Sequence, residues 1–261
     1  MKSRHDEKVF LDRPKAAPEQ VHVFDQKEID AIDAALAARR PLLVRGEPGI
    51  GKSQLARAAA KHLRRVYVQH VVDARTESRD LLWHYDAVAR LADAQLAGAL
   101  GDRGEEIRER LVVRNYLHPG PLWWAFDWGG ALRQAKTVGD ASPPQDESER
   151  EPPSPANGCV VLIDEIDKAE SDVPNGLLEA LGAGEFTPLG ANGPVIARDP
   201  PPLVIITTNN ERALPDAFLR RCLVLHLTLP EDETELKQVL VYRGGRHFPD
   251  ASVEVLEEAA Q

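Results

Sequence analysis

Short, almost wholly apolar segments recur along the chain and predict strands. The segment CVVLIDE shows no alternation between apolar and polar positions, so we expect that strand to be buried on both faces. Each segment ends at glycine, polar or charged residues, which is where the strand should stop. The five predicted strands are PLLVRG (41–46), RVYVQHVV (65–72), CVVLIDE (159–165), PLVIITTNN (202–210) and RCLVLHLTL (221–229).

Before and between these strands, apolar residues recur at helical spacing. In the first such segment, Ile29, Ile32 and Leu36 fall on one face. Strands that alternate with helices predict an α/β fold with a parallel sheet covered on both faces. A further segment, 184–199, predicts a hairpin with its tip at 190–194. The predicted helices are Asp25–Arg39, Gly51–Leu63, Arg79–Leu100, Leu122–Gln134 and Val173–Leu181.

Two segments show neither the apolar runs typical of strands nor the helical spacing of apolar residues. Residues 1–22 are polar, and we expect a flexible N-terminal segment there. Residues 139–158 are rich in proline, serine and acids and contain no large apolar residue, which predicts a disordered insertion. These segments leave residues 23–229 as one core, followed by a short C-terminal part over 230–261.

Composition narrows the class of protein. With 261 residues, 43% of them hydrophobic, the chain can bury a substantial core. A net charge of −10 argues against a broad nucleic-acid surface. The polar N-terminus is not a signal peptide, and no apolar run approaches membrane-span length, so we expect a soluble cytoplasmic protein. Cys159 and Cys222 match no zinc spacing and are predicted to be buried free thiols.

The sequence RGEPGIGKSQ carries the first candidate chemistry, in the pattern G-x-x-x-x-G-K-S. Its glycines allow backbone N–H groups to turn inward, and the following helix begins with a partial positive charge. Lys52 can bridge the β- and γ-phosphates of ATP, and Ser53 can ligate Mg²⁺. A chance glycine turn is the alternative, which the strand–loop–helix context disfavours. The predicted nucleotide-binding residues are Gly46, Glu47, Pro48, Gly49, Ile50, Gly51, Lys52, Ser53 and Gln54.

An acidic pair, Asp164 and Glu165, ends a buried strand. Such a position is costly for carboxylates unless a cation lies near, although a solvated strand end is the plain alternative. Beside a phosphate loop, Asp164 can hold a water of the Mg²⁺ shell, and Glu165 can act as the base that polarises the attacking water. The pair therefore predicts nucleotide hydrolysis, with Ser53 and Asp164 as metal-site residues.

Two further groups are candidates for the same reaction. The polar cluster 207–210 closes another buried strand, and an amide there could orient the attacking water, although an Asx turn explains it equally. Arg220 and Arg221 end a short helix. They are either a favourable charge on the helix C-terminus or an arginine finger offered to a neighbouring subunit.

With these motifs in order, the chain resembles the AAA+ ATPases, and within them the MoxR-type branch. The resemblance covers Val23 to Leu229 without the insertion. It implies a P-loop NTPase three-layer sandwich with sheet order 5-1-4-3-2, Asn209 as the sensor 1 residue, and Arg221 as the finger with Arg220 as the alternate. The motifs that carry it are GEPGIGKS, HPGPLWWAF, VVLIDEIDKA, LLEALGAGEFTPLG and TTNNERALPDAFLRR.

The resemblance also implies inserts around Arg79–Leu117 and Glu185–Ala197, and a helical C-terminal lid. About thirty residues follow Leu229, which predicts a partial lid without a recognisable sensor 2 arginine. The implied function is an ATP-driven, chaperone-like remodeller that assembles as a homo-oligomer, in the form of a hexameric ring. Its implied client is a protein, with a von Willebrand factor A domain protein as the expected partner. A nucleic-acid motor and a non-hydrolysing nucleotide switch or scaffold remain as alternatives.

Overall fold

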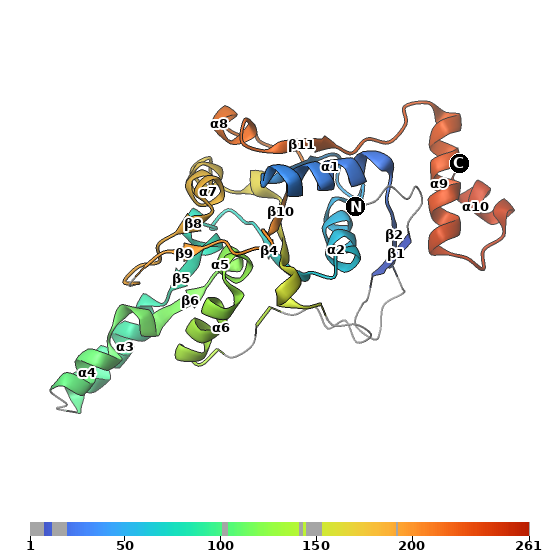
Figure 1. Ribbon diagram of the computed structural model, residues 1–261. Coiled ribbons are helices and arrows are strands. Elements are labelled where there is room, and N and C mark those ends of the chain that lie inside the picture. Colours follow the sequence, from blue (N-terminus) through green and yellow to red (C-terminus); the bar gives the residue numbers. More distant parts are fainter. Residues whose placement is uncertain are drawn as a thin grey trace.

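The computed structural model describes residues 8–11, 20–100, 104–140, 143–144, 153–191 and 193–260 (Figure 1). Its central sheet has five parallel strands in the order β11-β3-β10-β7-β4. Numbered along the chain as predicted, this order is 5-1-4-3-2, so the predicted fold class is confirmed. The strands are β3 (Leu42–Arg45), β4 (Val66–Val71), β7 (Cys159–Asp164), β10 (Leu203–Thr208) and β11 (Leu223–His226).

Helices cover the two faces of this sheet and make two separate cores. On one face, α1 (Gln26–Ala38) and α2 (Lys52–His62) pack on alternate strand residues such as Val44 and Leu162. On the other face, α5 (Pro121–Phe126), α6 (Trp128–Thr137) and α7 (Asp172–Ala183) pack on the intervening residues, such as Leu43 and Val161. Burial on both faces explains why the strand sequences are apolar without alternation.

Residues next to its two ends determine where α1 begins and ends. Asp25 is the N-cap and accepts from the backbone N–H of Glu28 at 2.8 Å, while the Glu28 carboxylate accepts from the N–H of Asp25 at 2.9 Å. This capping box satisfies donors that the helix leaves open. Arg39, in the left-handed region at φ 52°, ends the helix. The predicted range Asp25–Arg39 therefore matches helix plus caps.

The predicted helix Arg79–Leu100 is wrong in its first third. The chain forms η1 (Ser78–Leu81) and then β5 (Trp83–Tyr85), and only α3 (Ala87–Ala99) is helical throughout. The cause is a remote partner, because β5 pairs antiparallel with β6 (Leu117–Pro119). The elements α4 (Glu105–Arg110) and η2 (Val113–Tyr116) complete this insert, which projects away from the central sheet in Figure 1.

The predicted helix Leu122–Gln134 is two helices, since Asp127 interrupts it. Asp127 has an extended φ of −141°, and its side chain accepts from the backbone N–H of Gly130 at 3.1 Å, which caps α6. Arg198 also donates to the same carboxylate at 2.9 Å. The predicted hairpin over 184–199 is present as β8 (Glu185–Phe186) paired with β9 (Val195–Ile196).

The N-terminal segment differs from its prediction wherever it is described. Residues Lys8–Leu11 form β1, which pairs antiparallel with β2 (Gln20–Val23), whereas a flexible segment was predicted over 1–22. The rest of that prediction, over 1–7 and 12–19, lies outside the described residues.

The predicted insertion 139–158 is described only in part, since 141–142 and 145–152 lie outside the described residues. Its last residues are held on the body. They form η3 (Pro155–Asn157), and the Asn157 amide donates to the carbonyl of Arg64 at 2.9 Å. The carbonyl of Gly158 accepts from the N–H of Val66 at 3.1 Å. The end of the segment thus belongs to the folded body rather than to a disordered loop.

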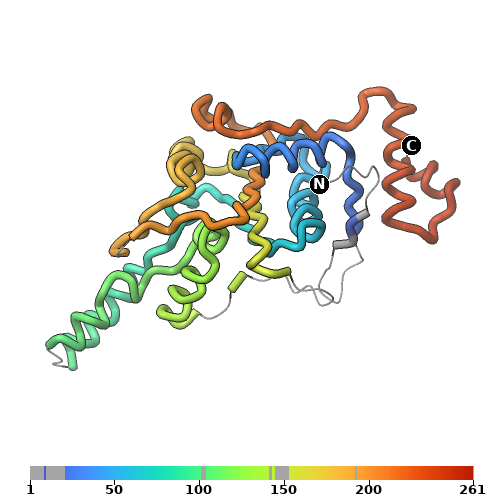
Figure 2. Tube along the Cα trace, viewed as in Figure 1, coloured from blue at the N-terminus to red at the C-terminus, as the bar shows by residue number. Residues whose placement is uncertain are grey.

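The C-terminal part is helical. After the short α8 (Asp216–Leu219) and β11, the chain forms α9 (Glu233–His247) and α10 (Val253–Ala259), which lie on the side of the molecule away from α8 (Figure 2). Asp232 caps α9 by accepting from the N–H of Glu235 at 2.9 Å. Within the described ranges, no helix has both the length and the apolar character needed to cross a membrane.

Both cysteines are buried free thiols, as predicted. Burial raises the pKa of Cys159 to about 12 and that of Cys222 to about 11. Because the thiolate is the reactive form, we expect neither residue to react with a chromogenic disulfide reagent in the folded protein at pH 8. Absorbance should rise only after a denaturant is added. Rapid reaction of one thiol in the native protein would contradict this placement.

Candidate functional site

The glycine loop lies between the carboxyl end of β3 and the start of α2. Gly46 has φ 155° and Gly51 has φ 106°, both unfavourable for residues with a side chain. At Gly46, a Cβ would also lie 2.5 Å from the carbonyl oxygen of Leu227. The loop therefore needs glycine for two reasons, backbone conformation and close approach of the chain after β11. Its tip, Glu47 to Gly49, is exposed.

Lys52 lies at the centre of this loop, and its side chain is almost fully buried. Its Nζ donates to the carbonyls of Gly46 at 2.7 Å and Glu47 at 2.9 Å, and to Oδ1 of Asn209 at 2.7 Å. The ammonium group thus joins the loop to the end of β10. This link brings together two predicted site residues that are far apart in the sequence.

Two opposing effects act on the pKa of Lys52. Burial lowers the pKa of its ammonium group, which is the larger effect. The carboxylates of Asp164, Asp167 and Glu165 act in the opposite direction and raise that pKa. The three nearby acids favour the charged form of the lysine, but burial outweighs them, so the pKa of Lys52 stays below its usual value.

Asp164 is held by two hydroxyl groups. Ser53 Oγ lies 3.1 and 3.0 Å from the two carboxylate oxygens, and Thr207 Oγ1 donates to Oδ1 at 2.6 Å. Thr207 is completely buried and also accepts from the N–H of Glu165 at 2.8 Å. Sequence reasoning placed Thr207 only within a polar cluster. A threonine ending an apolar strand beside the acidic strand was the available signal for this contact.

Glu165 has a left-handed backbone, at φ 60°, which turns the chain sharply after β7. Its Oε1 accepts from Nδ2 of Asn209 at 3.2 Å, and its Oε2 accepts from Nζ of Lys168. The Asn209 amide thus bridges Lys52 and Glu165, because its oxygen faces the lysine and its nitrogen faces the carboxylate. Of the predicted residues, the structure brings Lys52, Ser53, Asp164, Glu165 and Asn209 into one bonded group.

Arg221 is not part of this group. Its guanidinium is exposed and donates at 3.0 Å to the carbonyl of Ala217, in the short helix α8 that precedes it. The side chain of Arg40 holds the backbone there, donating to the carbonyls of Arg220, Arg221 and Cys222. In Figure 1, α8 lies above α7 at the upper edge of the molecule, away from α2. The arginine is thus placed on the surface rather than at the loop of its own chain.

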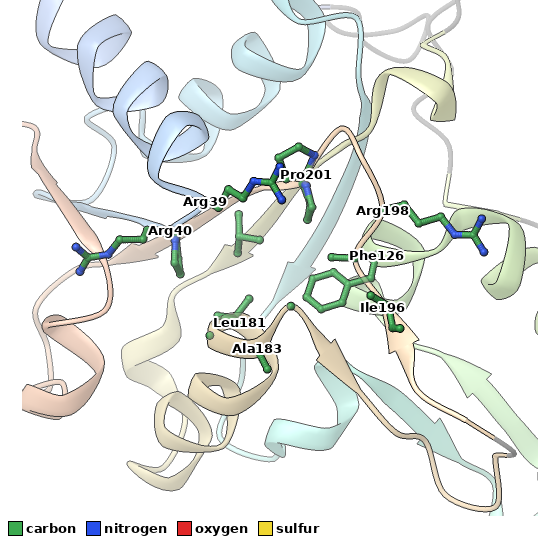
Figure 3. Close-up of a pocket in the computed structure, with 14 residues that line it drawn as sticks. Arg39, Arg40, Phe126, Leu181, Ala183, Ile196, Arg198 and Pro201 are labelled. Carbon is green, nitrogen blue, oxygen red and sulfur yellow. The ribbon is translucent and has the colours of Figure 1, made fainter.

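A pocket of about 230 Å³ lies at the opposite edge of the sheet, before the amino ends of β3 and β10 (Figure 3). Its lining mixes arginines with apolar side chains, among them Arg39, Arg198, Phe126 and Ile196. A neighbouring pocket of about 380 Å³ includes Arg220 and Arg221. Neither contains a residue of the glycine loop, so these hollows are separate from the bonded group.

The family described as AAA domain (dynein-related subfamily) matches residues 41–243. Two solved structures share 16% identity and a TM-score of 0.46 over 90% of this chain: a proposed ATPase from Cytophaga hutchinsonii and a mutant of RuvB from Thermotoga maritima. The chain spans 61% and 55% of their respective lengths. No curated protein matches the chain.

Proposed function

We propose that this chain, which belongs to the AAA domain family (dynein-related subfamily), binds ATP and hydrolyses it to ADP and phosphate. One observation carries the proposal: the Asn209 amide joins the lysine of the glycine loop to the carboxylate of Glu165. A phosphate group bound at Lys52 would therefore lie next to a base and to an amide able to orient water. A site that only binds a nucleotide needs neither a base nor an amide that orients water.

The residues present fit ATP and Mg²⁺. The loop 46–54 combines left-handed glycines, a helix N-terminus and a buried ammonium, which are the features that hold phosphates. Ser53 and Asp164 place hydroxyl and carboxylate oxygens 3.0 Å apart, and oxygen is the donor that Mg²⁺ prefers. Ser53 would be the direct ligand and Asp164 would hold a water of the ion's shell. When bound, the ion neutralises charge on the phosphate oxygens.

In the proposed reaction, the residues of this chain have distinct roles. Lys52 keeps its positive charge on the β- and γ-phosphates throughout. The Glu165 carboxylate accepts a proton from the attacking water, and the Asn209 side chain orients that water. Thr207 keeps Asp164 in place by donating to its carboxylate.

The position of Arg221 supports action between subunits. An exposed arginine outside its own site can reach the phosphate of an adjacent copy, which is how an arginine finger in trans works. We therefore infer a homo-oligomer. The hexameric ring that we propose as its form rests on the family resemblance alone. Arg220 remains the alternate finger.

The finer assignment is a MoxR-type, chaperone-like remodeller in the cytoplasm. Two features support it: the insert 78–119 and the hairpin β8–β9 fall where this branch has its inserts. The proposed client is a protein, with a von Willebrand factor A domain protein as the proposed partner. We assign α9 and α10 to a partial helical lid, and residues 23–229 to the ATPase core.

The base is tested with Glu165→Gln. The amide keeps the shape of the side chain but cannot take a proton, so ATP should still bind while turnover falls by about 10² or more. Calorimetry measures binding and phosphate release measures turnover. A matched control is Glu170→Gln, since the Glu170 side chain is 78% exposed and pairs only loosely with Arg212, at 3.7 Å.

Three outcomes separate the alternatives. Turnover of Glu165→Gln at the parent rate means that Glu165 is not the base. Loss of binding in this variant means that the carboxylate serves the fold of the loop instead. A parent protein that binds ATP without any turnover supports the nucleotide switch over the ATPase.

A further inference from the structure

A third acid lies near the two already assigned. Asp167 is in η4 (Ile166–Lys168), directly after the acidic pair, and it is only 2% exposed. Burying a carboxylate is costly unless it is hydrogen bonded or near a positive charge. Its environment therefore shows what this acid does in the site.

One oxygen of Asp167 holds the loop that follows β10. Oδ2 accepts from the backbone N–H of Asn209 at 3.1 Å and from that of Glu211 at 2.9 Å. Between them, Asn210 has a left-handed backbone at φ 60°. The carboxylate thus fixes the chain on both sides of this turn, and with it the Cα from which the Asn209 side chain extends.

The other oxygen, Oδ1, is buried without a hydrogen-bond partner among the residues that the structure describes. A neutral acceptor would satisfy the two N–H groups without burying a charge. The charge has a different counterpart, since the Asp167 carboxylate is one of the groups that stabilise the ammonium of Lys52. Asp167 therefore acts on the site in two ways. It accepts a hydrogen bond from the Asn209 backbone, and its negative charge favours the charged form of Lys52.

We propose that Asp167 is a positioning residue that sets the Asn209 amide between Lys52 and Glu165. The proposal rests on the ATPase function proposed above. Asp167 acts through Asn209, because its carboxylate accepts from the backbone N–H groups of Asn209 and Glu211 and from none of the reacting groups among the described residues. A misplaced amide leaves nucleotide binding intact but no longer orients the attacking water.

The test compares Asp167→Ala and Asp167→Asn with the parent. We expect Asp167→Ala to lower kcat by about ten- to a hundredfold, as small displacements of reacting groups do. The KM for ATP should change much less, because Asp164 and Glu165 still favour the charged form of Lys52. Asp167→Asn keeps an acceptor oxygen but a weaker one, so its loss should be smaller. Asp172→Ala is the matched control, since Asp172 is exposed in the first turn of α7, and its kcat should equal that of the parent.

A second arm places the same changes in an Asn209→Ala background. If Asp167 acts through Asn209, neither Asp167 variant should lower kcat further once Asn209 is alanine. The reason is that residues that act as one unit have non-additive effects. Should Asp167→Ala not fold, Asp167→Asn carries the same comparison. Additive losses, or a raised KM for ATP that accounts for the fall, would overturn the proposal.

Amide hydrogen exchange provides a readout that does not depend on turnover. In Asp167→Asn, exchange at the N–H groups of Asn209 and Glu211 should speed up while the glycine loop stays unchanged. If the parent shows no ATP turnover, the ATPase function fails, and this exchange result alone decides whether Asp167 holds the loop. Unchanged exchange at both amides would overturn the proposal.

Discussion

Replacing Lys52 with alanine is expected to abolish ATP binding at ordinary nucleotide concentrations. The Lys52 ammonium is buried in the glycine loop and already has three acceptors at 2.7 to 2.9 Å. A backbone N–H cannot replace a full charge on a phosphate, and charge-assisted hydrogen bonds are about twice as strong as neutral ones. We expect the affinity for ATP to fall by at least about a hundredfold, or roughly 2.7 kcal/mol.

The measurement is calorimetric titration with ATP and Mg²⁺. Lys61→Ala is a matched control, because Lys61 is exposed in the last turn of the same helix. The control should bind ATP as the parent does. If Lys52→Ala also retains the parent affinity, the glycine loop is not the phosphate site.

The pH dependence of binding follows from the same lysine. Burial lowers the pKa of Lys52 below its ordinary value of 10.5, and the protonated form is the one that binds phosphate. ATP affinity in the parent should therefore fall as the pH rises through this lowered pKa, before exposed lysines lose their protons. In Lys52→Arg the affinity should stay flat over that range, because arginine remains charged.

Replacing Arg221 with alanine is expected to lower ATP turnover on the order of 10³-fold while ATP affinity stays nearly intact. The guanidinium would stabilise charge that develops in the transition state more than charge in bound ATP. The backbone there should be unaffected, since Arg40 holds it through carbonyl groups and not through the Arg221 side chain. Steady-state phosphate release checks the rate, and Arg220→Ala shows which of the two arginines acts.

Action of Arg221 on a neighbouring subunit can be tested by mixing two inactive variants. An Arg221→Ala subunit keeps its own glycine loop, and a Lys52→Ala subunit keeps its arginine. Mixing the two inactive variants should restore part of the ATPase activity where a complete loop meets a complete arginine. Sedimentation must first show that both variants assemble. If they assemble and mixing restores nothing, Arg221 is a surface charge at the end of α8 and not a finger.

The amino-acid sequence by itself determined the local features of this protein. The glycine loop, the capping box of Asp25 and Glu28, and the five apolar strands depend on backbone preference and on burial of neighbouring residues. Backbone preference and burial can both be inferred from about ten consecutive residues of the sequence. The candidate groups Lys52, Asp164 and Glu165 were therefore found from their positions at the ends of predicted elements. The strand order was implied by family resemblance and not by the residues alone.

Tertiary structure decided everything that needed a remote partner. The segment 83–85 has a helical pattern but becomes a strand because β6 is available to pair with it. Asp167 was not among the predicted site residues, because only the pairing of β10 with β7 brings the Asn209 backbone to its carboxylate. The contact between Lys52 and Asn209 likewise joins residues 157 positions apart. Sequence patterns report which residues are buried, but side-chain partners are set by which strands become neighbours in the sheet.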